Sequence, residues 1–227
     1  MSQKTVVLSP HLDDAVFSCW NKIIKQNTQV ITIFAGIPKD KTPSSWDLSL
    51  NQTDARKGAQ LRRKENADAL RATKTKILNL NNLDNLYRKS PPSIMKIADK
   101  IYSIIPRSAT VIAPAGIRRY QRKGHEDHIL VRQIALELIN RGIQVKFYAD
   151  IPYMLPRYIL PSWPKHILKR MIEYKLGMKV KIEAVELSRK QQLKKQSACE
   201  AYKTQFRAFG AFNRPGAYRW EIIIHPK

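Results

Sequence analysis

The feature that most constrains the fold of this chain is the regular alternation of short apolar segments with longer amphipathic ones. Short runs rich in β-branched and other apolar residues are expected to be buried strands at 4–9, 29–34, 76–80, 110–113 and 145–149. Segments with a helical spacing of apolar residues lie between and after them at 14–26, 53–72, 91–105 and 124–140. Strands that alternate with helices in this way indicate a parallel sheet with helices on both faces. The expected fold is an α/β, Rossmann-like three-layer sandwich with a mostly parallel sheet.

The pattern changes in the last third of the chain. Four prolines interrupt residues 151–180, which are expected to form an excursion from the sheet. Residues 186–204 then predict a basic amphipathic helix, and residues 218–224 predict a last strand. Earlier in the chain, the polar segment 38–52 predicts a loop because it is rich in Pro, Ser and Asn. The whole chain, 1–227, is expected to be a single domain with a C-terminal elaboration.

The first chemical signal is the sequence Pro-His-Leu-Asp-Asp at residues 10–14, directly after the first expected strand. Binding sites in open α/β sheets form at the carboxyl ends of the strands. His11 and Asp14, three residues apart in a turn, can face one centre, and imidazole and carboxylate are both good zinc ligands. Asp13 then points elsewhere and is free to act as a base beside a metal. Taken alone, the two aspartates could equally be a helix N-cap and a first-turn acid.

The second signal is His-Glu-Asp-His at residues 125–128, at the start of the helix expected after the fourth strand. His125 and His128 share a helix face, and Asp127 could orient an imidazole as an outer hydrogen-bond acceptor. Taken alone, the two histidines could be a helix-start residue and a partly buried one. Both motifs together favour two histidines and one carboxylate around a metal with open positions, the pattern of a hydrolytic zinc site. Such a metal lowers the pKa of bound water from about 15.7 to roughly 7.

These motifs resemble those of the PIG-L/LmbE-like N-deacetylases, zinc enzymes that remove acetyl groups from N-acetylglucosamine-type substrates. The family's His-Pro-Asp-Asp motif corresponds to residues 11–14 here, and its His-Pro-Asp-His motif corresponds to residues 125–128. Leu12, Ala15 and Glu126 depart from the family's pattern, but none of them replaces a candidate ligand. Weaker matches lie at 32–38, 62–65, 148–153 and in the late helix at Lys195, Tyr202 and Gln205.

The resemblance implies that His11, Asp14 and His128 bind Zn²⁺ and that Asp13 is the general base. The expected function is therefore metal-dependent hydrolysis through a metal-activated water. The reaction would remove an N-acyl group, with acetyl favoured, from an amino sugar or a glycoconjugate.

The resemblance also implies roles for residues around the metal. His125 would stabilise the oxyanion or act as the general acid, and Asp127 would set its orientation. Arg62 or Arg63 would contact the substrate. A structural salt bridge to Glu65 is an equal alternative for this pair of arginines.

The net charge of the chain supports a different class of function. Lys and Arg number 41 and Asp and Glu number 18, which leaves a net charge of +23. Such a surplus favours anionic partners, so an alternative is a basic protein that binds nucleic acid or an anionic membrane on a deacetylase-like scaffold. A solvated basic surface would explain the charge as well. Because no nucleic-acid motif is visible, a small-molecule or glycoconjugate substrate, which the charge would allow to be anionic, is favoured over nucleic acid.

Two further observations bear on location. Aromatic and basic residues interleave within 151–180, which suits peripheral contact with an anionic membrane; a substrate-cleft wall or ordinary packing is the alternative. Cys19 and Cys199 form no disulfide-framework pattern, which favours a reducing cytoplasm. No segment reaches the roughly 18 apolar residues that a membrane-spanning helix needs. The expected location is the cytoplasm, with membrane-peripheral contact as an option.

Overall fold

The computed structural model describes residues 3–117, 125–154, 165–206 and 217–227, and its centre is a seven-stranded sheet. The strands are β1 (Thr5–Ser9), β2 (Thr28–Thr32), β3 (Lys76–Asn79), β4 (Thr110–Pro114), β5 (Gln144–Tyr148), β6 (Val180–Glu186) and β7 (Trp220–Pro226). Their spatial order is β3-β2-β1-β4-β5-β7-β6. The first five are parallel, whereas β7 runs antiparallel to both of its neighbours. The prediction of a mostly parallel α/β sheet is confirmed.

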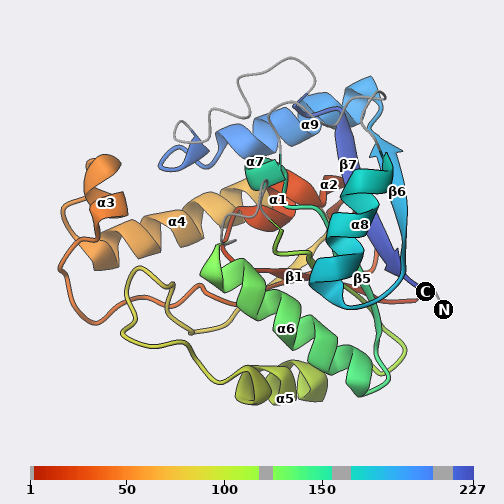
Figure 1. Cartoon of the computed structure of the whole chain (residues 1–227). Helices are drawn as coiled ribbons and strands as arrows, with labels where there is room; N and C mark the ends of the chain where they lie inside the picture. Colours follow the sequence, from red (N-terminus) through yellow and green to blue (C-terminus); the bar gives the residue numbers. More distant parts are fainter. Residues whose placement is uncertain (1–2, 118–124, 155–164, 207–216) are drawn as a thin grey trace.

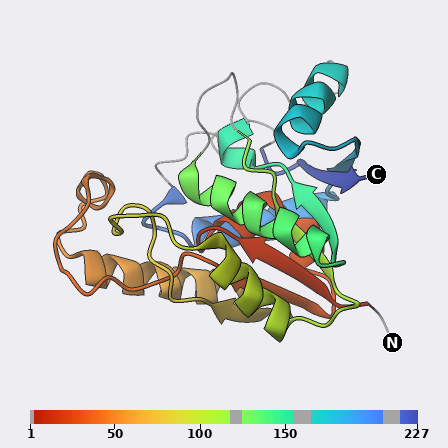
Figure 2. The ribbon, with the colours of Figure 1, turned by 60° about the horizontal axis from the view of Figure 1, so that its bottom comes forward.

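Helices cover both faces of this sheet (Figures 1 and 2). Helices α5 (Ile94–Ile104), α6 (Glu126–Asn140) and α8 (Lys165–Leu176) pack on one face. Helices α1 (Asp14–Ser18), α2 (Trp20–Ile23), α4 (Ala55–Leu70) and α9 (Arg189–Glu200) pack on the other. Two short helices, α3 (Ser45–Ser49) and α7 (Ile151–Met154), lie in connecting segments. The architecture is the expected three-layer sandwich.

The core consists of two apolar layers, one on each side of the sheet. Val6 of β1 belongs to the layer that contains Ile134 of α6, whereas its neighbour Val7 belongs to the layer that contains Phe17 and Leu70. Successive strand residues point to opposite faces, so a strand buried on both sides must be apolar at every position. This is why the central strands were readable from their unbroken apolar runs.

The helix expected after the first strand is instead two short helices that meet at Cys19. The Glu221 carboxylate on β7 accepts hydrogen bonds from the backbone amides of Trp20 (2.7 Å) and Asn21 (2.9 Å). It also pairs with Lys195 of α9 at 2.7 Å, and both charged side chains are fully buried. The break therefore has a physical cause, because a buried carboxylate caps the second short helix.

Strand β6 was not predicted from the sequence. Its residues lie between the excursion predicted at 151–180 and the helix predicted at 186–204. β6 pairs with β7 and, among the described residues, ends the sheet. An edge strand needs no continuous apolar run, and exposed Lys181 and Glu183 interrupt this one. Its sequence therefore lacks the signal that identified the buried strands.

The segment 151–180, predicted as an excursion, contains α7 and α8, and α8 packs beside β6. Five of the ten residues that suggested a membrane interface lie outside the described residues, namely Arg157, Tyr158, Ile159, Leu160 and Trp163. Of the helices that the structure describes, none has the length and hydrophobicity required to span a bilayer.

Candidate metal centre

The site lies where the connections from two adjacent parallel strands diverge. β1 pairs with β4, and the chain leaves β1 toward β2 on one side and leaves β4 toward β5 on the other. Residues 10–14 follow β1, and α6 begins with the second motif after β4. This divergence creates a crevice at the carboxyl ends of the strands, where ligands bind in open α/β folds. The two imidazoles of His11 and His128 meet there, with ring centroids 5.4 Å apart.

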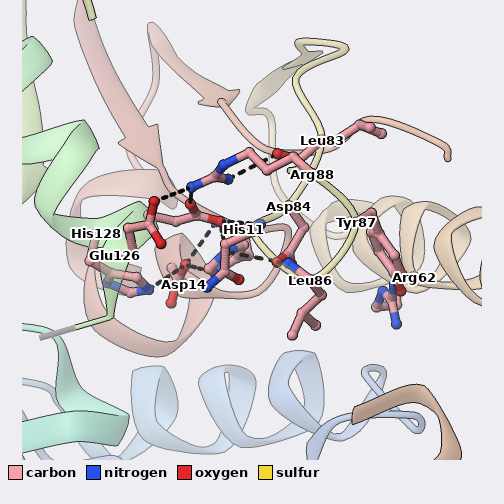
Figure 3. Close-up of polar contacts among 12 residues, drawn as sticks. His11, Asp14, Arg62, Leu83, Asp84, Leu86, Tyr87, Arg88, Glu126 and His128 are labelled. Carbon is pink, nitrogen blue, oxygen red and sulfur yellow. Dashed lines mark hydrogen bonds and ion pairs between the residues drawn. The ribbon is translucent and has the colours of Figure 1, made fainter. Parts of the chain in front are cut away.

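Three candidate donor atoms converge at this point (Figure 3). Asp14 Oδ2 lies 3.3 Å from His11 Nδ1 and 3.3 Å from His128 Nε2. Zinc bonds of about 2.0–2.1 Å in tetrahedral geometry place neighbouring ligand atoms about 3.3 Å apart. His128 Nε2 is buried and has no hydrogen-bond partner within the described parts of the chain. The donor set therefore fits a divalent cation that prefers nitrogen and oxygen ligands.

Each of these imidazoles directs its other nitrogen to a carboxylate. His128 Nδ1 lies 2.7 Å from Asp150 Oδ1, and His11 Nε2 lies 2.9 Å from Asp127 Oδ2. Such outer carboxylates fix the tautomer and orientation of a metal-binding histidine. Asp150 also accepts a hydrogen bond from the Gly116 amide at 2.9 Å, which ties it to the segment after β4. Asp150 was not among the predicted site residues, although its position directly after an apolar strand was an available signal.

Asp127 is placed differently from the prediction that it orients His125. Its hydrogen-bond and ion-pair partners in the described structure are His11, Arg88 and the Asn85 amide. Burial raises the pKa of this carboxyl, but His11 and Arg88 outweigh that effect and lower it to about 2. Asp127 is therefore an anionic partner of the first motif, although it belongs to the second.

His125 lies beside both candidate ligands, with ring centroids 4.8 Å from His11 and 5.2 Å from His128. Donor atoms of the three histidines lie within 4.8 Å of one another. His125 Nδ1 is buried without a hydrogen-bond partner among the described residues. Burial, followed by the neighbouring imidazoles of His11 and His128, lowers the pKa of His125 to about 3. The side chain is thus a neutral imidazole at the edge of the donor cluster.

Asp13 is buried, with 3 % of its surface exposed, and lines the cavity next to the donor cluster. It occupies the N-cap position of α1, yet its side chain makes no capping hydrogen bond, which removes the support for a purely structural N-cap. Its Oδ2 atom has no hydrogen-bond partner within the described residues. Burial and the neighbouring Asp14 carboxylate raise the pKa of Asp13 to about 7.

A cavity of about 260 Å³ opens beside these groups. Its lining combines polar side chains of the two motifs, His11, Asp13 and His125, with aromatic and apolar side chains, including Phe34, Trp46, Leu86, Tyr87 and Tyr153. Aromatic faces interleaved with a few polar groups are typical of small-ligand sites.

Arg62 lines the same cavity, but its charge is already paired. Its Nη1 lies 3.0 Å from Asp47 Oδ1, and its Nη2 donates to the Tyr87 hydroxyl. Tyr87 in turn donates to Asp47 at 2.7 Å. Asp47 belongs to α3, which lies in the segment predicted as a loop and begins with a capping box formed by Asp47 and Ser44. The alternative of a structural salt bridge to Glu65 is wrong for Arg62, because Asp47 is its ion-pair partner.

Arg63 is not among the described residues that line the cavity. Its Nε donates to the Ala35 carbonyl at 2.7 Å, and its Nη2 donates to Asn81 Oδ1 at 2.9 Å. Glu65 accepts hydrogen bonds from the Thr204 amide and hydroxyl at 2.9 and 2.6 Å, which ties α4 to the segment after α9. Arg63 and Glu65 therefore hold secondary-structure elements together, whereas Arg62 forms part of a cavity wall.

The fold and the donor cluster together define an α/β protein with a candidate metal centre of the hydrolytic type. The family model described as GlcNAc-PI de-N-acetylase, PIG-L, matches residues 6–139, which contain both motifs. The chain belongs to this family of de-N-acetylases. A comparison with curated protein sequences gives no match.

Several solved structures share this fold. The zinc-inhibited form of the teicoplanin deacetylase Orf2 matches at a TM-score of 0.75 and 20% identity, over 98% of this chain and 97% of that one. The A40926 pseudoaglycone deacetylase Dbv21 matches at 0.72 and 20% identity, over 98% and 96%. The N,N'-diacetylchitobiose deacetylase from Pyrococcus horikoshii matches at 0.57 and 18% identity, over 99% and 84%. At these identities the likeness establishes the fold.

Proposed function

We propose that this protein is a zinc-dependent N-deacetylase that removes the acetyl group from an N-acetylated amino sugar of a glycoconjugate. The observation that carries the proposal is the convergence of three donor atoms. Asp14 Oδ2 lies 3.3 Å from both His11 Nδ1 and His128 Nε2, and buried Asp13 lies beside them in the cavity wall. His11, Asp14 and His128 would hold the ion. When bound, it supplies Lewis acidity toward the amide carbonyl and toward water.

Asp13 is the proposed general base. It faces the cavity and carries a buried oxygen without a hydrogen-bond partner in the described structure. A carboxylate in that position can take a proton from the attacking water and can pass it toward the leaving amine. Its neighbour Asp14 contacts the imidazoles of His11 and His128. The two adjacent aspartates are therefore proposed to have different roles, Asp14 as a metal ligand and Asp13 as the base.

We propose that His125 stabilises the oxyanion, because an imidazole that is neutral at physiological pH is poorly suited to protonate the leaving amine. It lines the cavity, and its ring centroid lies 4.8 Å from that of His11. A neutral imidazole can donate one N–H to the oxygen of a tetrahedral intermediate. Tyr153 also lines the cavity, and its ring centroid lies 6.0 Å from that of His125.

The aromatic lining supports a carbohydrate substrate. Phe34, Trp46 and Tyr87 contribute aromatic side chains, and Asp84 and Arg62 contribute polar groups, to the lining of the same cavity. Amphipathic sugar rings require this combination of apolar faces and hydrogen-bonding edges. Among the related solved structures are a deacetylase in complex with teicoplanin and an N,N'-diacetylchitobiose deacetylase, which supports a glycoconjugate or sugar substrate here. Of the two arginines predicted to contact the substrate, we propose Arg62, because Arg63 donates hydrogen bonds to the Ala35 carbonyl and to Asn81.

The test combines metal analysis with amine release. We expect one zinc ion per chain, and free amine from at least one member of a panel of N-acetylated sugars, nucleotide sugars and glycolipids. Asp13→Asn should keep the metal and lose turnover by about 10²–10⁴-fold, the usual contribution of a general base. Asp68→Asn, on the exposed surface of α4, is the matched control and should retain activity. A protein that binds no divalent metal, or an Asp13→Asn variant with full activity, would refute the proposal.

A further inference from the structure

We infer that Arg88 is a positioning residue that couples one wall of the cavity to the metal ligand His11 through the buried carboxylate of Asp127. The inference rests on the proposed function, because it concerns the same metal centre. It assigns a role to a residue outside both sequence motifs. Figure 3 shows Arg88 reaching from the segment after β3 to the start of α6.

Asp127 uses both of its oxygens in this arrangement. Oδ2 lies 2.9 Å from His11 Nε2 and accepts a hydrogen bond from the Asn85 amide at 3.1 Å. Oδ1 lies 2.5 Å from Arg88 Nη2. The Asp127 side chain is fully buried, and a buried carboxylate needs a cation or several donors to remain charged. Arg88 therefore supplies the charge that allows Asp127 to hold the His11 imidazole.

Arg88 is itself held in one orientation. Its side chain is 9% exposed and its guanidinium lies 4.9 Å from the centroid of the Phe34 ring. Nη1 donates to the Leu83 carbonyl at 3.1 Å, while Nη2 contacts the carboxylates of Asp127 and Glu126. A planar guanidinium can make these bonds at the same time, which a lysine ammonium cannot do in the same geometry.

The same contacts fix the segment 83–88, which forms a wall of the cavity. Asp84, Leu86 and Tyr87 line the cavity, and the alternate residues Leu83 and Asn85 are bound through their backbones to Arg88 and Asp127. The ion pair between Arg88 and Asp127 thus contributes both to the position of this wall and to the orientation of His11, whose Nε2 also lies 3.5 Å from Asp84 Oδ2. Loss of that pair should weaken metal binding and substrate binding together.

Glu126 provides a control that distinguishes the positioning role of Arg88 from the general effect of removing a surface ion pair. It lies 3.1 Å from the same guanidinium, but its side chain is 50% exposed, so its ion pair should contribute little. Asp127 is fully buried and contacts His11. A change at Glu126 removes one carboxylate from Arg88 while leaving the link to His11 intact, and it provides the matched control.

The experiment measures zinc affinity by competition with a chelator, without substrate, and then KM and kcat on the zinc-loaded protein. Arg88→Met should weaken zinc binding by about 10–100-fold, the usual effect of losing an outer partner of a metal ligand, and should raise KM. Glu126→Gln should change the zinc affinity and the KM by no more than about threefold each. Unchanged zinc affinity in a folded Arg88→Met variant would overturn the inference.

A double-mutant cycle tests whether Arg88 acts through Asp127. In an Asp127→Asn background, Arg88→Met should weaken zinc binding by less than about a further threefold. If the two substitutions instead weaken zinc binding additively, Arg88 acts by another route and the inference is overturned.

If Arg88→Met does not fold, Arg88→Lys decides the question. The lysine should keep the zinc affinity and raise KM, because it retains the charge but loses the Leu83 carbonyl; unchanged KM would count against the coupling. Wild-type protein that binds no zinc would instead refute the proposed function itself, and this inference with it.

Discussion

Replacing Lys195 by Met should unfold this protein at a markedly lower temperature. Lys195 Nζ lies 2.7 Å from Glu221 Oε1, and both side chains are 0% exposed. The substitution leaves the Glu221 carboxylate buried with the amides of Trp20 and Asn21 as donors but without a countercharge. Removing one partner of a buried pair costs about 3–5 kcal/mol.

The expected shift in melting temperature follows from the size of the chain. Each kcal/mol changes Tm by about 2–4 °C in a chain of 150–250 residues, so the loss should be roughly 6–20 °C. Urea unfolding, followed by circular dichroism, gives the free energy, and thermal unfolding gives Tm. Lys190→Met, on an exposed turn of the same helix, is the control and should stay within about 0.5 kcal/mol of wild type.

A double variant distinguishes loss of charge balance from loss of packing. Lys195→Met with Glu221→Gln removes both charges, while the Gln carbonyl can still accept a hydrogen bond from the start of α2. It should therefore be more stable than Lys195→Met alone, because no uncompensated charge is buried. A Lys195→Met variant that loses less than about 1 kcal/mol, or a double variant less stable than the single one, would refute this account of the ion pair.

Three further predictions concern the site and its supports. Asp150→Asn should weaken zinc binding by about 10–100-fold in a chelator competition, because the His128 imidazole loses its anionic partner. Tyr202→Phe should cost about 1–3 kcal/mol in urea unfolding, because the buried hydroxyl that donates to the Leu12 carbonyl is lost. Burial raises the pKa of Asp47, but its hydrogen bonds outweigh this and lower it below the ordinary value. Its stabilising effect should therefore be complete above about pH 4 and decline as the pH falls further, so the difference in unfolding free energy between wild type and Asp47→Asn should shrink in acid.

The departures from prediction have a common cause. Local patterns report which residues of one element face the core, but they do not report contacts between distant elements. The break at Cys19 depends on Glu221, about 200 residues later in the chain. Likewise, Arg62 pairs with Asp47 on a short helix 15 residues earlier, although Glu65 lies one turn away in the same helix. Spacing within a helix suggested the nearer partner, whereas packing of α3 against α4 selected the other.

The sequence by itself determined the α/β class, the central parallel strands and both His/Asp motifs, because a buried strand and a donor-rich turn each leave a continuous local signature. The tertiary structure alone decided which carboxylate serves which imidazole. Asp127 lies beside His125 in the chain but contacts His11, and Asp150 reaches His128 from the end of another strand. These pairings arise because the carboxyl ends of adjacent parallel strands meet in space, and no local periodicity records that meeting.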